Sequence, residues 1–150
     1  MPTHDHENGT EHTVDLLCQL VQLEYDTMAA YRAAIGRVDS TDARAELALF
    51  FDHHEATAKA LASCIDRYGG AARSGTDLDQ AWNRGRVALA DLADDHSLLE
   101  ALAHLEDDIH TAYERAQSDL RAVGDPPLAS AVESALAAEE FHREWLRHAS

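Results

Sequence analysis

Glu139 and His142 stand three positions apart in the segment ALAAEEFHREWL, residues 135–146, which has the pattern of an amphipathic helix. A glutamate and a histidine at this spacing lie on one helical face and can bind one metal ion together, as in helix bundles that hold carboxylate-bridged metal pairs. The same face carries apolar residues at Leu128, Val132, Ala135 and Leu146. Both polar groups are therefore expected in a packed core, where each needs a partner.

Three further helical stripes are interrupted by a polar residue near the middle, at Glu24, His54 and Glu106. Counted from the turns between consecutive segments, these residues and Glu139 reach one level to within about a helical turn. Ionised carboxylates alone in an apolar core cost on the order of several kcal/mol each, and a divalent or trivalent cation removes that cost. The pattern thus predicts a metal centre. Its candidate ligands are Glu24, Glu106, Glu139 and His142, with His54 either a ligand or a hydrogen-bonded core histidine.

Other polar residues close to the stripes are expected to be ordinary. His53 falls beside its stripe and is predicted at the surface. Asp107 and His110 are also three positions apart, but they lie on the flank of their helical face and are predicted to be solvated. Tyr31 and Tyr113 are expected to be packing residues that also offer a hydroxyl group.

The elements that must position these groups are long helices with short joints. The chain contains only three prolines and seven glycines, which cluster between stretches rich in alanine and leucine, and no strand pattern is present. Residues 1–12 are expected to be a disordered tail, and residues 13–150 a single domain. Helices are predicted at residues 13–38, 41–68, 76–93 and 97–123, and from residue 126 onward.

Turn and cap residues set these boundaries. Asp39, Ser40 and Thr41 offer a turn and a helix N-cap, and Gly69 with Gly70 provides a glycine stop. Ser97 with a glutamate three residues later resembles a capping box. Gly124, an aspartate and Pro126 supply a stop, a cap and a first-turn proline for the last helix.

An internal repeat relates two of the long helices. Residues 16–34 align with residues 98–116 and share leucines, a glutamate followed seven positions later by a tyrosine, and alanines. The repeat indicates a duplicated helical hairpin, whose copies can pack about a two-fold axis if residues 76–93 carry the chain back along the bundle. The sequence therefore predicts an all-α, antiparallel four-helix bundle with a helical crossover between its second and third long helices.

Composition excludes several classes of function. Acidic residues number 28 against 12 basic ones, and the formal net charge of −16 repels nucleic acid and anionic membrane surfaces. No apolar run is long enough for a membrane span, and the start MPTHDHENGTEH lacks export features, so we expect a cytoplasmic protein.

The two cysteines, Cys18 and Cys64, are expected to be reduced thiols, although a disulfide bond between them is geometrically possible. No phosphate-binding loop, nucleophile elbow or HExxH motif occurs.

The arrangement of Glu24, Glu106 and Glu139-x-x-His142 around a long crossover resembles the ferritin-like superfamily of di-iron carboxylate proteins. More narrowly, the segments YGGAARSGTDLDQAWNRG and HLEDDIHTAYERA resemble a bacterial family of ferritin-like four-helix-bundle proteins of unassigned function, over residues 13–147. The resemblance implies that Glu24 and Glu106 are terminal ligands, that Glu139 bridges two metals, and that His142 binds one of them.

The resemblance also implies that Tyr31 and Tyr113 donate hydrogen bonds around the ligands. One departure from the superfamily pattern lies in the segment 41–68, where a full site has Glu-x-x-His and this chain has His54 and Thr57. A bridging carboxylate and a histidine are therefore missing. The centre is either a metal pair with five protein ligands, His54 among them, or a single metal.

Two functions follow from this pattern. The first is a homodimeric, non-haem metal protein, with iron as the first choice and Mn or Zn as alternatives, which oxidises Fe(II) or reduces O₂ or peroxide. The second is a metal-free bundle whose altered second helix records a lost activity, and which has a structural or partner-binding role under stress.

Overall fold

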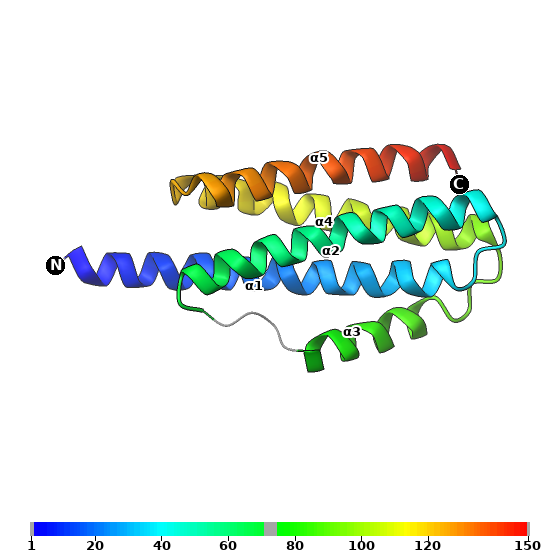
Figure 1. Cartoon of the computed structure of the whole chain (residues 1–150), viewed down its shortest axis with the longest axis horizontal. Coiled ribbons are helices and arrows are strands. Elements are labelled where there is room, and N and C mark those ends of the chain that lie inside the picture. The colour runs from blue at the N-terminus through cyan, green and yellow to red at the C-terminus, as the bar shows by residue number, and fades with distance from the viewer. Residues whose placement is uncertain (1, 71–74, 150) are drawn as a thin grey trace.

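Five helices make up the part of the chain that the computed structural model describes (Figure 1). Backbone is described for residues 2–70 and 75–149, and side chains for these residues apart from 2–8, 75–79 and 82. The helices are α1 (Pro2–Ile35), α2 (Thr41–Arg67), α3 (Gly75–Ala88), α4 (Asp95–Ala122) and α5 (Pro126–Ala149). The described residues contain no strand, which confirms the predicted all-α class.

The four longer helices lie side by side, with α1 in contact with α2 and α4, and α5 in contact with α2 and α4. Figure 1 shows that neighbours in this ring run in opposite directions, since α1 and α5 run one way and α2 and α4 return. The shorter helix α3 lies outside the ring against α1 and leads from the end of α2 toward the start of α4. The inner faces of four helices therefore surround a common interior.

Two apolar clusters fill that interior at different levels. One cluster includes Leu17, Leu61, Leu120 and Leu128, and the other includes Leu47, Leu102 and Leu146. Along every long helix a polar residue falls between the residues of the two clusters: Glu24, His54, Glu106 and Glu139. The apolar stripes thus hold one polar layer between two layers of packed side chains.

Helix ends mostly follow the cap and turn residues of the sequence. Of the three residues expected to offer a turn and a cap, Ser40 is the N-cap of α2, because its side chain accepts a hydrogen bond from a backbone N–H of the first turn. Gly69 and Gly124 have φ values of 78° and 74°, a left-handed conformation that only glycine adopts at little cost. The N-cap of α4 is Asp94 and not Ser97, whose N–H instead donates to the Asp94 carboxylate at 2.7 Å.

Three further boundaries differ from those expected: α1 ends at Ile35 and not at residue 38, and the other two are the start of α1 and the end of α3. Helix α1 begins at Pro2, whereas the sequence places the helix start near Thr13 after a disordered segment 1–12. A proline fits the first turn of a helix because its missing N–H has no intrahelical partner there. The hydroxyl of Thr13 donates to the carbonyl of Gly9 at 2.9 Å, a bond within a continuous helix and not a cap.

Helix α3 is shorter than predicted and ends at Ala88. The Arg37 guanidinium donates to the carbonyls of Leu89 and Leu92, and these bonds satisfy backbone groups that would otherwise require further helical turns. The joint that leads into α3, residues 71–74, lies outside the described residues.

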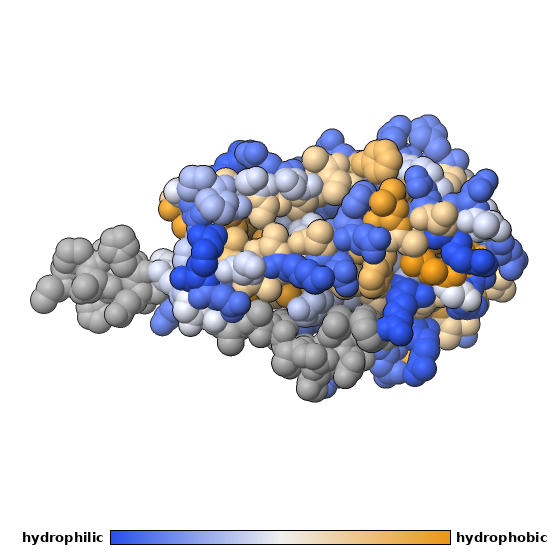
Figure 2. Space-filling model, viewed as in Figure 1, coloured by the Kyte–Doolittle hydropathy of each residue, from blue (hydrophilic) through white to orange (hydrophobic). Residues whose placement is uncertain are grey.

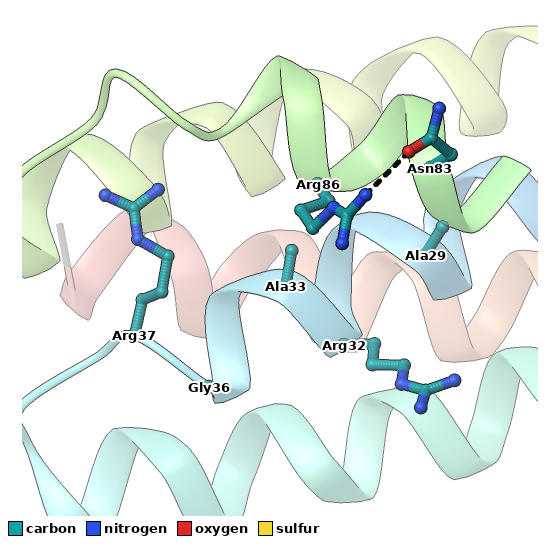
Figure 3. A pocket seen from close by; sticks show the side chains of 7 residues that line it. All are labelled: Ala29, Arg32, Ala33, Gly36, Arg37, Asn83 and Arg86. Atoms are coloured by element: carbon teal, nitrogen blue, oxygen red, sulfur yellow. Dashed lines mark hydrogen bonds between the residues drawn. The ribbon is translucent and has the colours of Figure 1, made fainter.

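Close packing holds α3 against α1. A Cβ atom at Gly85 would lie 2.8 Å from the Ala29 carbonyl carbon, so only glycine allows the two backbones this approach. An open pocket of about 660 Å³ lies beside this contact (Figure 3). Asn83, Arg86 and Arg37 line it, and Arg86 donates to the Asn83 side chain at 2.8 Å. None of its described lining residues belongs to the buried polar layer.

The surface is mixed, with polar and apolar residues interspersed over the face shown in Figure 2. Large apolar residues with substantial exposure are Leu49, Val87, Val123 and Phe141. Among the helices in the described part of the chain, none combines the length and the apolar character needed to cross a membrane. Cys18 and Cys64 are part of one apolar core region and are not joined by a disulfide.

Candidate metal centre

The polar layer contains all five metal ligands predicted from sequence. Each of these side chains is at most 2% exposed: Glu24, His54, Glu106, Glu139 and His142. They come from four helices, with α1, α2 and α4 supplying one residue each and α5 supplying two. The helical stripes bring them to one level because each stripe faces the interior and each polar residue sits near its middle.

His54 lies between two carboxylates. Its Nδ1 is 2.7 Å from Glu24 Oε2, and its Nε2 is 2.6 Å from Glu106 Oε1. A ring with an acceptor at each nitrogen is best satisfied as an imidazolium that donates both protons. Burial alone lowers the pKa of an imidazole, but Glu24 and Glu106 outweigh burial and hold the pKa of His54 well above 6.5.

The two tyrosines of the internal repeat form reciprocal hydrogen bonds. The Tyr31 hydroxyl on α1 donates to Glu106 Oε1 on α4 at 2.6 Å, and the Tyr113 hydroxyl on α4 donates to Glu24 Oε1 on α1 at 2.7 Å. Burial and the nearby carboxylates raise the pKa of both hydroxyls well above 10, so both remain protonated donors. Each glutamate of the repeat is thus held by the tyrosine of the other copy.

Other atoms of the layer have no hydrogen-bond partner. These buried atoms are Glu106 Oε2, both carboxylate oxygens of Glu139, His142 Nδ1 and His110 Nδ1. His142 Nδ1 lies 3.3 Å from Glu106 Oε1, but the geometry is not that of a hydrogen bond. A buried polar atom without a partner costs on the order of 1–3 kcal/mol, and such atoms are rare in native proteins. These atoms of the polar layer are therefore available to a cation, a proton or a water molecule.

Charge in the layer is unevenly balanced. Burial raises the pKa of a carboxyl group, yet His54 and His142 outweigh that effect for Glu106 and lower its pKa to about 2. Among the described residues, Glu139 accepts no hydrogen bond from a histidine, and the Nδ1 atom of His110 lies 3.7 Å from its Oε2. Burial, and then the charges of Glu24 and Glu106, raise the pKa of Glu139 to about 9. Glu139 therefore requires either a bound proton or a metal ion at neutral pH.

Three of these side chains lie close enough together that they could hold a metal ion. One ligand atom each from His54, Glu106 and His142 can be chosen so that all three lie within 4.8 Å of one another. Two atoms bound to one metal at about 2.1 Å each lie roughly 3–4 Å apart, so small movements would bring this triad to ligand distances. Imidazole and carboxylate donors suit Fe, Mn and Zn alike.

His53 contacts the polar layer, although the sequence predicted it at the surface. Its Nδ1 lies 2.8 Å from His142 Nε2, and the two rings are parallel to within 7°. The His142 ring also stacks on Phe50, with ring centroids 4.1 Å apart. These contacts form because α2 and α5 touch, so a side chain beside the α2 stripe meets α5 and not solvent.

His110 is the second residue whose environment differs from the prediction. Its side chain is 13% exposed, and its Nδ1 lies 3.7 Å from Glu139 Oε2. The prediction of a solvated residue is wrong for His110, whereas Asp107 is half-exposed and accepts a surface hydrogen bond from Arg143 at 2.7 Å. His110 follows Glu106 by four positions, a spacing that places both on one helical face and that could have identified it.

Residues 12–119 match the family model described as "Domain of unknown function (DUF2383)". The matched segment contains Glu24, His54 and Glu106 and ends before Glu139 and His142. No curated protein matches the chain. Because the match covers well over half of the sequence, the chain belongs to the DUF2383 family of domains of unknown function.

Proposed function

We propose that this protein is a ferritin-like four-helix bundle that binds iron in the polar layer between its helices. The ring of contacts among the long helices, with α3 as an outer crossover, supports this class of fold. One observation carries the proposal: buried nitrogen and oxygen atoms without partners gather where three glutamates and two histidines meet. A metal ion would satisfy these atoms and offset the carboxylate charges together.

The residues would hold the metal in distinct ways. Glu106 Oε2, His142 Nδ1 and the Glu139 carboxylate are the donors without competing hydrogen bonds. His54 Nε2 would join them after losing its proton, since only neutral imidazole binds a metal. Glu24 would complete the set of five ligands.

Tyr31 and Tyr113 would fix the carboxylates of Glu106 and Glu24 by the hydrogen bonds described above. Outer hydrogen bonds of this kind orient ligands and tune a metal. Because each tyrosine bonds to the glutamate of the other repeat, the pair would hold the carboxylates of α1 and α4 at the same level of the bundle.

Iron would supply redox chemistry: oxidation of two Fe(II) to Fe(III) releases two electrons, which with two protons reduce one hydrogen peroxide to two waters. O₂ is an alternative oxidant. The protein's own contribution would be a buried, water-poor site and an overall charge of −16, which raises the local concentration of cations. Mn or Zn would fit the same donors.

A metal-free role is the second candidate, and a specific observation favours it. Glu24, His54 and Glu106 form a hydrogen-bonded chain that the two tyrosines extend, and this chain needs no metal. With Glu139 neutral through a bound proton, the layer would serve as a structural element in a bundle with a structural or partner-binding role. His142 Nδ1 and Glu106 Oε2 would remain without partners.

Metal analysis separates the two functions. Protein purified without a histidine tag is stripped with a chelator, exposed anaerobically to Fe(II), desalted and analysed for bound iron. We expect stoichiometric iron in the wild type, its loss in Glu106→Gln, and its retention in Glu100→Gln, a matched change at an exposed position of α4. Equal iron in both variants, or none in the wild type, would favour the metal-free role.

A further inference from the structure

We propose that His110 and Glu139 form a second metal position beside the one at Glu106 and His142. This inference rests on the proposed function and deepens it. The α2 helix has His54 and Thr57 where a full site has Glu-x-x-His. In this proposal His110 of α4 replaces the histidine that α2 lacks.

The orientation of the His110 ring supports this role. Its Nε2 lies 3.2 Å from Glu114 Oε1, an exposed carboxylate one turn further along α4. A carboxylate at Nε2 favours the tautomer with its proton on Nε2, which leaves the lone pair on Nδ1. Nδ1 is buried and lies 3.7 Å from Glu139 Oε2. The pairing of a carboxylate with the outer nitrogen of a histidine is the usual environment of a metal-bound imidazole.

The distance between the two candidate ligands favours a metal over a shared proton. His110 Nδ1 and Glu139 Oε2 are 3.7 Å apart, and neither atom has a hydrogen-bond partner. A proton shared between them would draw the atoms to about 2.7–2.9 Å. Two ligands of one metal at about 2.1 Å each lie roughly 3–4 Å apart, which matches the observed separation.

Glu139 can serve both metal positions. Its Oε2 faces His110, and its Oε1 is likewise buried without a partner, so each oxygen is available to a different ion. Its side chain is 2% exposed, and among the described residues the imidazole of His110, neutral in the tautomer given above, is the one basic group within ion-pair distance. A carboxylate in this environment is suited to join two cations.

His110 also offers a route for the ion. Its side chain is 13% exposed, and Glu114, the residue at its outer nitrogen, is 61% exposed. The pair therefore connects the protein surface with the buried carboxylate of Glu139. A cation attracted by Glu114 would reach the second position without crossing the apolar clusters.

The test counts metal ions per chain and does not depend on activity. Co(II) is titrated into chelator-treated protein by calorimetry, and bound cobalt is measured after desalting. We expect two Co(II) per wild-type chain, one in His110→Gln, and two in His104→Gln, a matched change at a 75% exposed histidine of α4. Far-UV circular dichroism of each variant verifies that the helices are retained.

A second variant serves if His110→Gln fails to fold. Glu114→Gln changes an exposed residue, and we expect it to lower the affinity for the second Co(II) only, by roughly 10- to 100-fold. Losses of this size are typical when a residue that is hydrogen-bonded to a metal ligand is removed. Two ions of unchanged affinity in both variants, or a single ion in the wild type, would overturn the inference and leave the proposed function intact. A wild type that binds no ion would overturn the proposed function itself.

Discussion

His54 explains how two of the three buried glutamates are accommodated. As an imidazolium it donates to Glu24 and Glu106 at 2.7 and 2.6 Å, so that two carboxylates share one positive charge. Glu139 receives no comparable bond, and its pKa is raised to about 9 as a result of burial and its acidic neighbours. The carboxylates of Glu24 and Glu106 therefore have hydrogen-bond donors, whereas that of Glu139 has none within the described part of the chain. The metal hypothesis concerns the atoms that have no hydrogen-bond partner.

Glu139 should make the stability of the metal-free protein depend on pH. Its pKa is about 9 in the folded state and 4.5 in the unfolded state, so folding takes up a proton between these values and stability falls as pH rises through that window. Glu139→Gln should remove this contribution, about 3 kcal/mol between pH 6 and pH 8 at 1.36 kcal/mol per pH unit.

Urea unfolding with a chelator present, at pH 6 and pH 8, measures the effect. Glu139→Gln should be more stable than the wild type at pH 8 while binding less metal. Glu140→Gln, at the exposed neighbouring position, should behave like the wild type. The same pH slope in wild type and Glu139→Gln would show that Glu139 is not held protonated in the folded state.

The tyrosine pair supports a second prediction. Tyr31→Phe and Tyr113→Phe each remove a hydrogen bond to a buried carboxylate, so each should lower the free energy of unfolding by about 1.5–3 kcal/mol. The repeat implies similar losses for the two variants. Tyr25→Phe is the matched control, at a partly buried tyrosine of α1 that packs against an apolar cluster. Thermal and urea unfolding report the differences, and a neutral result for both variants would contradict the reciprocal bonds.

Helical periodicity identified the buried polar residues because a stripe defines which side of a helix faces the interior. His53 lies beside its stripe, and His110 was assigned to the flank of its helix although its spacing from Glu106 allows both to share one face. Whether a flanking side chain meets solvent or a neighbouring helix depends on how far each helix is rotated about its axis. One sequence does not specify that rotation, whereas the structure places α5 against both residues through His142 and Glu139.

At the scale of elements, α3 depends on one glycine. Gly85→Ala introduces a Cβ atom 2.8 Å from backbone of α1, so α3 must move outward, at a cost of about 1–3 kcal/mol that exceeds the roughly 1 kcal/mol gained in helix propensity. Gly9→Ala meets nothing within 4 Å and should be neutral or slightly stabilising. Urea unfolding compares the two variants, and equal effects would contradict the close approach.

Helix ends were predictable where the chain must turn sharply. Gly69 and Gly124 adopt the left-handed conformation that their positions implied. The start of α4 was placed too late because Asp94 and Ser97 are both good caps, and only the three-dimensional course of the chain decides between them. The end of α3 depends on Arg37, a residue from another element whose contact is not evident in the local sequence.

At the scale of the whole molecule, the internal repeat predicted two hairpins in a common arrangement, and the helices α1 with α2 and α4 with α5 form such pairs. Glu24 with Tyr31 and Glu106 with Tyr113 recur in the repeat and bond across it. The pairing of helices that are distant in the sequence could therefore be predicted, because a duplicated sequence implies one helical hairpin and a second copy of it. The surface was less informative, since its apolar residues have no comparable periodicity.

The homodimer remains a prediction from sequence. One chain has a mass of 16.5 kDa, so sedimentation velocity should show a single species of about twice that mass at micromolar concentration. A species of one chain at every concentration would contradict the prediction without affecting the interior site.

Anomalous diffraction at the iron edge, from crystals of the wild-type protein loaded with Fe(II), tests the metal hypothesis most directly. We predict an anomalous peak at ligand distance from Glu106, Glu139 and His142. Iron-loaded crystals with no anomalous peak in the polar layer, and with Glu139 in the position it occupies without metal, would contradict the hypothesis that these buried acids bind a cation.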